Sequence, residues 1–314
     1  MKKLISMKKV VLGLLLLTVT LTGCTSGQKV ENIVMTYVSS PLNVPSIVEK
    51  NQGAFQQAFS DAGYTFEYSN LTTGPEQTQA LASGSVQFLN CVGSTSVILA
   101  AANGADVKIL DMYSRSSKPF TLISNDDSIN SPEDMRGKTV GGPVGTVLHE
   151  LLVAYLASGN MSIDDVNFVN MGIPDALAGL SNGSVDVAML AGPAAFNAQK
   201  EFHLVTTGEG LINSTLVVAV SNDFYQNNKE AIDIFRNVQQ DTLAYITNNN
   251  DSALQMVADE LDLSLNDVKE MYAMYDFNSA ITAEDIANMQ KTADFMLENG
   301  MIDNAVNVQD LIID

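Results

Sequence analysis

The chain has 314 residues and carries 16 Lys and Arg against 36 Asp and Glu, which gives a formal net charge of −20 at pH 7. Such an acidic protein is not expected to bind nucleic acid, because phosphate binding requires a basic surface. Its two cysteines and two histidines are too few for a disulfide framework, a zinc site or a haem site. We therefore expect no cofactor and no metal ion.

The N-terminus has the order of parts found in an export signal. Several lysines precede an apolar run at residues 10–21, which is too short to cross a bilayer, because that takes about 20 residues. The run ends in Leu21-Thr22-Gly23-Cys24, which resembles the bacterial lipobox, where the cysteine is acylated after cleavage. We expect residues 1–23 to be a cleaved lipoprotein signal peptide, Cys24 to carry the lipid, and residues 24–30 to be a polar tether.

This lipid would hold the mature protein outside the cytoplasm, at the cell membrane of a bacterial envelope. Anionic headgroups would repel so acidic a chain, so the attachment has to come from the lipid. The alternatives are an ordinary signal peptide that happens to contain a cysteine, or a transmembrane anchor. Cys91 lies in an apolar run at residues 86–92 and is expected to be a small core residue rather than a reactive thiol.

Between residues 32 and 220, short strand-like runs alternate with helical runs. This alternation predicts parallel sheets covered by helices. The expected strands are residues 33–38, 65–69, 86–91, 107–113, 138–141, 166–171, 185–190 and 204–207, and the expected helices are residues 45–62, 75–82, 96–103, 147–157 and 174–180. From residue 222 onward only helices are expected, at residues 229–247, 252–261, 264–275 and 282–299.

Two parts of this series match each other at a constant offset: Gly84 and Gly183, like Gly93 and Gly192, are 99 residues apart. In each part a helix ends at a glycine suited to the left-handed conformation, a buried strand follows, and a second glycine follows the strand. The match favours two similar lobes, although any αβ unit can have this order.

Several motifs occur in the order and spacing of one family. They are Ala80-Leu81-Ala82-Ser83-Gly84-Ser85-Val86-Gln87-Phe88, Ser131-Pro132-Glu133-Asp134-Met135-Arg136-Gly137, and Gly145-Thr146-x-x-His149. Together they resemble the substrate-binding proteins of ABC importers, in the group for nitrate, taurine, alkanesulfonates and the thiamine pyrimidine precursor. The resemblance covers roughly residues 32–196, and the helical C-terminal part fits it too.

The resemblance implies an α/β, two-lobed periplasmic-binding-protein type 2 fold. Each lobe would be a mostly parallel sheet with helices on both faces, and two segments near residues 117–123 and 214–221 would cross between the lobes. Lobe 1 would comprise residues 31–118 and 220–314, with the helical C-terminal part packed on it. Lobe 2 would comprise residues 119–219.

The resemblance also implies a solute receptor that traps a small organic or inorganic anion, such as a sulfonate or nitrate, by hinge closure. It would be a monomer that delivers its ligand to the permease and ATPase subunits of an ABC importer. A neutral or aromatic solute, such as a thiamine pyrimidine precursor, is the alternative ligand. An adhesin or scaffold and an enzyme are the alternative classes, but only His149-Glu150 suggests an acid–base pair, so we predict no catalytic residue.

Ligands of parallel sheets bind beyond the carboxyl ends of the strands, where helix N-termini also point and favour anions. Polar residues and glycines stand at such junctions, and the predicted ligand contacts are Ser39, Ser40, Asn43, Gly93, Ser94, Thr95, Gly145, Thr146 and Gly192. The hydroxyl residues could instead be helix caps. Arg115 could pair with an anionic ligand, and Tyr37 or Phe196 could pack on its carbon skeleton.

One motif departs from the family pattern. Many relatives have Trp-Glu-Pro where this chain has Ala191-Gly192-Pro193. The change removes an acidic partner for an amine and an aromatic wall. It therefore weakens the case for a taurine-like ligand and predicts a roomier pocket.

Overall fold

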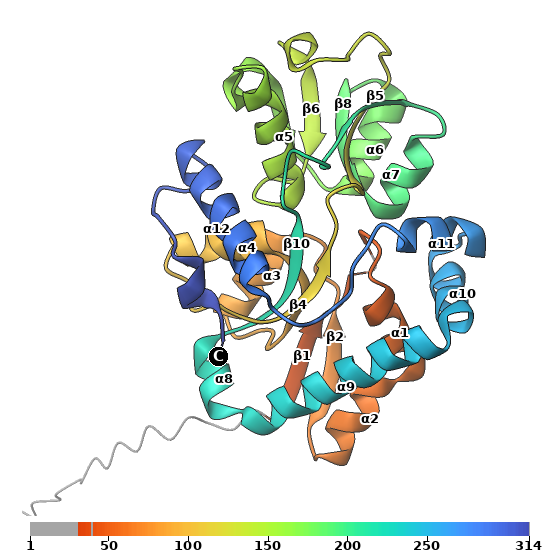
Figure 1. Cartoon of the computed structure of the whole chain (residues 1–314), viewed down its shortest axis with the longest axis vertical. Helices are drawn as coiled ribbons and strands as arrows, with labels where there is room; N and C mark the ends of the chain where they lie inside the picture. The colour runs from red at the N-terminus through yellow and green to blue at the C-terminus, as the bar shows by residue number, and fades with distance from the viewer. Residues whose placement is uncertain (1–30, 39, 314) are drawn as a thin grey trace, which may run out of the picture.

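Two α/β lobes lie one above the other in the computed structural model of the chain (Figure 1). The structure describes residues 31–38 and 40–313. The predicted signal peptide, the predicted lipid site at Cys24, the tether up to residue 30, and Ser39 lie outside the described residues. The described chain starts in the lower lobe, enters the upper lobe after strand β4 (Lys108–Arg115) and returns before strand β10 (Thr215–Val220).

The upper lobe contains a five-stranded mixed sheet of order β7-β6-β8-β5-β9. Strands β7, β6 and β8 are parallel, whereas β5 pairs antiparallel with both β8 and β9. All residues of β5 and β8 are buried, as expected for apolar strands covered by helices. The strands are β5 (Phe120–Ser124), β6 (Thr139–Gly142), β7 (Asn167–Asn170), β8 (Val187–Ala191) and β9 (His203–Thr207), and the helices are η1 (Pro132–Met135), α5 (Val147–Ser158), η2 (Ile163–Asp165), α6 (Ile173–Asn182) and α7 (Gly192–Ala198).

The lower lobe contains a parallel pair, β1-β2, and an antiparallel group of order β3-β10-β4. A parallel bridge between Met35 and Phe88 joins the two groups. The strands are β1 (Asn32–Thr36), β2 (Thr65–Ser69), β3 (Leu89–Gly93), β4 (Lys108–Arg115) and β10 (Thr215–Val220). The first helices are α1 (Val44–Gln52), α2 (Ala54–Asp61), α3 (Gly74–Ala82) and α4 (Ser94–Ala102).

The C-terminal helices complete the lower lobe, as predicted. Helices α9 and α10 pack on α1, and α12 packs on α4. Phe235 of α9 stacks on Phe88 and Phe55, with ring centroids 4.7 and 5.3 Å apart, and such pairs add about 0.5–1.5 kcal/mol to area burial. These helices are α8 (Asn222–Asn227), α9 (Lys229–Asn248), α10 (Asn250–Leu261), α11 (Leu265–Tyr272), α12 (Ala283–Glu298) and η3 (Val308–Leu311).

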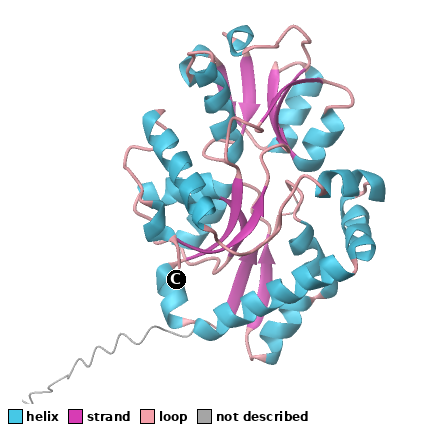
Figure 2. Ribbon diagram, in the orientation of Figure 1, coloured by secondary structure: helices cyan, strands magenta, loops and turns pink. Residues whose placement is uncertain are grey.

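The two-lobed α/β fold is confirmed (Figure 2), with mixed sheets in which most strands of each lobe run the same way. The exceptions are β5 and β10, each the first strand after the chain crosses into a lobe. Most other strands end at the edge that faces the opposite lobe. A strand that enters from that edge has to run the other way, so β5 and β10 are antiparallel to their neighbours.

The second crossing lies earlier than predicted. Residues 214–221 are mostly strand β10, which is paired with β3 and β4 in the lower sheet. The chain therefore crosses between β4 and β5, at residues 116–119, and between β9 and β10, at residues 208–214. This pairing favours a division of the described chain into residues 31–115 plus 215–313 and residues 120–207, which we propose in place of boundaries at 118/119 and 219/220.

One long predicted helix is broken in two. The expected helix at residues 45–62 is observed as α1 and α2, which are separated by Gly53 at φ 63°. Glycine takes this left-handed conformation without a side-chain penalty, and the N–H of Gly53 donates to the carbonyl of Lys50 at 3.1 Å. The glycine thus ends α1 and redirects the chain into α2.

The internal repeat has a structural counterpart. The unit α3-β3-α4 in the lower lobe and the unit α6-β8-α7 in the upper lobe have the same element order. Gly84 at φ 74° and Gly183 at φ 77° end the first helix of each unit. Among the helices of the described chain, none has the length and apolarity needed to span a bilayer.

Candidate functional site

A cleft of about 670 Å³ lies between the two lobes and is lined by residues of both. Five helices of the described chain start at this cleft, and their N-cap residues line it: Thr73, Gly93, Thr146, Gly172 and Ala191. The partial positive charge and the free N–H groups of helix N-termini favour an anionic group. Because these helices come from both lobes, an anion in the cleft would be held by both.

Much of the remaining cleft wall is apolar. Phe120, Leu148 and Ile173 contribute from the upper lobe, and Val38, Leu216 and Leu261 from the lower lobe. Polar groups placed within a mostly apolar pocket are the usual arrangement for small organic ligands. The cleft therefore suits a ligand that has an anionic head and an apolar body better than a bare inorganic anion.

Lys50 is the one cationic side chain among the described residues that line the cleft. Its Nζ lies 3.0 Å from Oε1 of Glu260 and 4.1 Å from the centroid of the Tyr37 ring. The Tyr37 hydroxyl also donates to Glu260 Oε1, at 3.0 Å. Hydrogen bonding from Lys50 lowers the pKa of Glu260. The ion pair is partly exposed, with 39% and 31% side-chain accessibility, so its net stabilisation is small and Lys50 can exchange Glu260 for a ligand anion.

Three of the predicted contact residues line the cleft: Ser40, Gly93 and Thr146. Thr146 also caps α5, because its Oγ1 accepts from the N–H of His149 at 3.4 Å and donates to the Pro143 carbonyl at 2.8 Å. Both the contact and the capping interpretation of this residue therefore fit its position. Apart from Ser39, which lies outside the described residues, the other predicted residues are placed elsewhere.

Asn43 and Ser94 are buried supports beside the cleft. The Asn43 amide donates to the carbonyls of Val38 and Ser40, at 2.6 and 3.2 Å, and so shapes the loop before α1. The Ser94 hydroxyl lies 2.8 Å from that of Thr215 at the start of β10. Each residue stabilises a segment that lines the cleft or leads into it.

Thr95, Gly145 and Gly192 lie where the lobes touch each other. Thr95 donates to a carboxylate oxygen of Glu150 at 2.6 Å, and the Gly145 carbonyl accepts from the Ser96 hydroxyl at 2.8 Å. Gly192 packs directly on the backbone of Pro41. The expectation that ligands bind beyond the carboxyl ends of the strands, here called the strand-end rule, thus found residues at the lobe interface as well as in the cleft.

Arg115 is placed away from the cleft, against the C-terminal part of the chain. Its Nε and Nη2 donate to both oxygens of Asp285, at 2.6 and 2.7 Å, and Nη1 also lies 3.3 Å from Asp276. The predicted pairing with a ligand is therefore replaced by a bidentate ion pair within the lower lobe. Its partners are more than 150 residues away in sequence, so the residues near Arg115 in the chain give no indication of this pairing.

Some cleft residues were absent from the sequence prediction. The loop at residues 70–73 follows β2, so the strand-end rule would have found it. Lys50 and Glu260 instead lie within helices α1 and α10, where nothing local distinguishes them from solvated charges. They meet only because α10 packs on α1.

The expected core residue Cys91 is buried, with 4% exposure, and also contributes to the cleft wall. It is the extra residue of a bulge in β3, at φ 71°. Behind it lies the carboxyl group of Glu49, which accepts from Asn90 at 3.4 Å. Burial raises the pKa of Glu49 to about 8, so this wall is uncharged at neutral pH.

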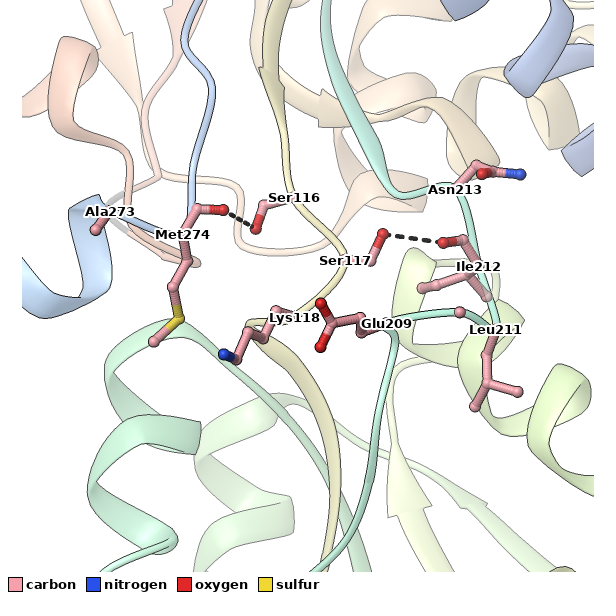
Figure 3. Close-up of a pocket in the computed structure, with 10 residues that line it drawn as sticks. Ser116, Ser117, Lys118, Glu209, Leu211, Ile212, Asn213, Ala273 and Met274 are labelled. Atoms are coloured by element: carbon pink, nitrogen blue, oxygen red, sulfur yellow. Dashed lines mark hydrogen bonds between the residues drawn. The ribbon is translucent and has the colours of Figure 1, made fainter.

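The two chain crossings lie side by side at the lobe junction (Figure 3). Ser117 on the first crossing donates to the Ile212 carbonyl on the second, at 2.9 Å, and Ser116 donates to the Met274 carbonyl. A polar pocket of about 560 Å³ opens beside them, flanked by Lys118 and Glu209. The hydrogen bond between the crossings couples them, as expected for a pair of hinge segments.

The alternative of an acid–base pair at His149-Glu150 finds no support in the geometry. The His149 ring stacks on Phe168, with centroids 5.3 Å apart, and its Nδ1 accepts from the N–H of Gly145 at 3.3 Å. Glu150 points into the lobe interface instead. Within residues 31–38 and 40–313, no three His, Cys, Asp or Glu side chains gather as metal ligands would.

Fold and cleft together define a two-lobed binding protein. The chain belongs to the family described as NMT1/THI5 like, which it matches over residues 44–253. It is 24% identical over 273 residues to a Bacillus subtilis (strain 168) protein named for binding aliphatic sulfonates, covering 85% of this chain and 82% of that one. It is 27% identical over 208 residues to the taurine-binding periplasmic protein of Escherichia coli (strain K12), covering 65% of this chain and 63% of the relative.

Solved structures share the fold. The alkanesulfonate-binding protein SsuA from Xanthomonas axonopodis pv. citri, bound to MOPS, superposes with a TM-score of 0.80 at 18% identity, covering 91% of this chain and 99% of that chain. The desulfurization enzyme DSZB also shares the fold, with a TM-score of 0.64 at 15% identity, covering 90% of this chain and 96% of that chain. The family resemblance noted in the sequence is confirmed, and the fold is one that supports both binding and catalysis.

Proposed function

We propose that the chain is the solute receptor of an ABC importer and that it captures a small organic anion, an alkanesulfonate in the first place, by closing its two lobes. The observation that carries this proposal is the cleft itself, where helix N-termini from both lobes meet an apolar wall and one lysine. The names of its relatives point to the same ligand class. The partners would be the permease and ATPase subunits, and the receptor would act as a monomer without catalysis.

Ligand titrations test this proposal. Butane- and hexanesulfonate should raise the unfolding temperature, and a ligand at 100 times its Kd should add about 2.7 kcal/mol to the free energy of unfolding. Each added methylene that enters the apolar part should contribute up to about 0.8 kcal/mol. Nitrate and pyrimidines should bind more weakly, as should taurine because the chain has Ala191-Gly192-Pro193. A response to pyrimidines alone would favour the neutral-solute alternative, and no response to any class would contradict the proposal.

Lys50→Met is expected to weaken sulfonate binding about tenfold, because it removes roughly 1.4 kcal/mol of charge-assisted hydrogen bonding. Calorimetry would measure the change. The matched control is Lys229→Met, which removes an exposed lysine of the lower lobe outside the cleft and should leave Kd unchanged. Equal affinities for the two variants would show that Lys50 does not contact the anion.

We further propose that Cys24 carries a lipid that keeps the receptor beside its permease. The support is the export-type N-terminus and the Leu21-Thr22-Gly23-Cys24 motif. Dual acylation gives stable membrane anchoring, which one chain does not. Cys24→Ser should shift the protein from the detergent phase to the aqueous phase in a phase-partition assay, whereas Cys91→Ser should not. An unmodified Cys24 in the intact mass of the membrane-associated protein would contradict this assignment.

A further inference from the structure

Glu150 joins the two lobes through both of its carboxyl oxygens. It lies on α5 in the upper lobe, and its side chain is only 3% exposed. Oε2 accepts from the Thr95 hydroxyl at 2.6 Å and Oε1 from the Thr292 hydroxyl at 3.0 Å. Both threonines belong to the lower lobe, on α4 and α12. The carboxyl group is therefore buried only because the lobes are together.

The surroundings supply no compensating positive charge. No ion pair of the described chain includes Glu150. Helix α4 and strands β5 and β8, which pack on α5, contain no ionisable side chain. Helix α5 itself also carries His149 and Tyr155. The ionisable groups on the other packed elements are Glu133 and Asp134 on η1, Asp164 and Asp165 on η2, and Glu284, Asp285, Lys291, Asp294 and Glu298 on α12.

The ionisable groups nearest to Glu150 do not supply a positive charge to it either. His149 is directed at Phe168, and burial lowers its pKa, which favours the neutral ring. Asp285 is paired with Arg115. Lys291 hydrogen-bonds to Asn288 on the exposed side of α12. A carboxylate at position 150 thus has two neutral hydroxyls in place of water, which does not fully compensate for the lost hydration.

We propose that Glu150 is a positioning residue for ligand capture, which favours lobe closure when protonated and opposes it when ionised, so that binding takes up a proton at this carboxyl group. The inference rests on the proposed function, because it assumes that capture closes the lobes. Separation of the lobes would expose Glu150 to water and remove both threonine partners. Closure would reverse this, although neither state requires the carboxyl group to touch the ligand.

The direction of the pH effect follows from the two states. Burial raises the pKa of Glu150 from 4.5 to about 7 in the closed form, although the hydrogen bonds from Thr95 and Thr292 act to lower it. Below about pH 4.5 both states are protonated, and above about pH 7 both are ionised. Between these limits closure takes up a proton and becomes less favourable as pH rises, by up to about tenfold per pH unit.

The test compares the purified protein with Glu150→Gln, which keeps the shape and both threonine contacts but cannot ionise. The Kd for hexanesulfonate should rise more than tenfold in the unmodified protein between pH 5 and pH 8 and should stay constant in the variant. At pH 8 the variant should therefore bind more tightly. Glu49 is present in both proteins, so its own titration cancels. Parallel pH profiles for the two proteins would overturn the inference.

A second measurement needs no ligand. Small-angle scattering of the ligand-free protein should show an increase in the radius of gyration between pH 5 and pH 8 that Glu150→Gln lacks. If no sulfonate binds but this difference is seen, the ligand assignment fails and the role of Glu150 stands. If hexanesulfonate binds but the pH profiles of Kd and of the radius of gyration are the same in both proteins, the ligand assignment stands and the role of Glu150 fails. Thr292→Val removes one hydrogen-bond donor to Glu150, so the pH interval over which Kd changes should extend to higher pH. This variant provides the test if Glu150→Gln does not fold.

Discussion

Gly192→Ala is expected to weaken ligand binding at least 100-fold while leaving both lobes folded. Gly192 starts α7 in the upper lobe at φ 57°, and a Cβ there would overlap the carbonyl group of Pro41 in the lower lobe. A backbone carbonyl has no rotamer with which to move aside, and the left-handed conformation itself costs about 1–2 kcal/mol for a residue with a Cβ. Separation of the lobes relieves the overlap, so the variant should remain open.

Calorimetry with hexanesulfonate, together with the radius of gyration from scattering, would measure both effects. The matched control is Gly183→Ala. Gly183 has a φ of 77°, yet nothing lies within 4 Å of its added Cβ. The control should therefore lose about 1–2 kcal/mol of stability and keep the Kd of the unmodified protein. If Gly192→Ala also kept that Kd, closure would not require the contact with Pro41.

Arg115→Ala is expected to lower the free energy of unfolding by about 3 kcal/mol, because it leaves a buried carboxylate without its partner. Asp285 has only 5% side-chain exposure and receives two hydrogen bonds from Arg115. Arg115 also donates to the carbonyls of Asn278 and Ala280, each at 2.7 Å. The guanidinium therefore fixes the segment that leads into α12.

Urea denaturation of the ligand-free protein would measure this loss. Arg136→Ala is the control, because its ion pair with Asp165 is exposed on the arginine side and should contribute less than about 1 kcal/mol. Burial acts to raise the pKa of Asp285, but the hydrogen bonds from Arg115 and Thr282 hold it at about 2. The stabilisation should accordingly be present above pH 4 and be lost between about pH 4 and pH 2. Unfolding curves that match those of the unmodified protein would contradict the structural role of Arg115.

The local features of the fold could be predicted from the sequence because they depend on near neighbours. Helix starts such as Thr146 and helix ends such as Gly183 depend on hydrogen bonds and backbone angles within a few residues. The order of strands and helices follows from hydrophobic periodicity. Where the sequence pattern alone was misleading, as at Gly53, a glycine within a helical run was the overlooked signal.

The composition of the site depended on contacts between distant segments. The junctions at the carboxyl ends of the strands were predicted from the sequence. Only the packing of one lobe on the other determines whether a junction residue faces the cleft, as Thr146 does, or the opposite lobe, as Gly192 does. Arg115 and Asp285 are 170 residues apart in the chain, so nothing near either residue indicates their pairing.

The sequence by itself therefore determined the family, the two-lobed α/β architecture and the edge of each sheet where a ligand would bind. The tertiary structure decided the direction of β5 and β10, the partner of Arg115, the meeting of Lys50 with Glu260, and the burial of Glu150 between the lobes. The physical reason is range: capping and periodicity act over a few residues, whereas burial, ion pairing and lobe contact are set by segments that meet only after folding.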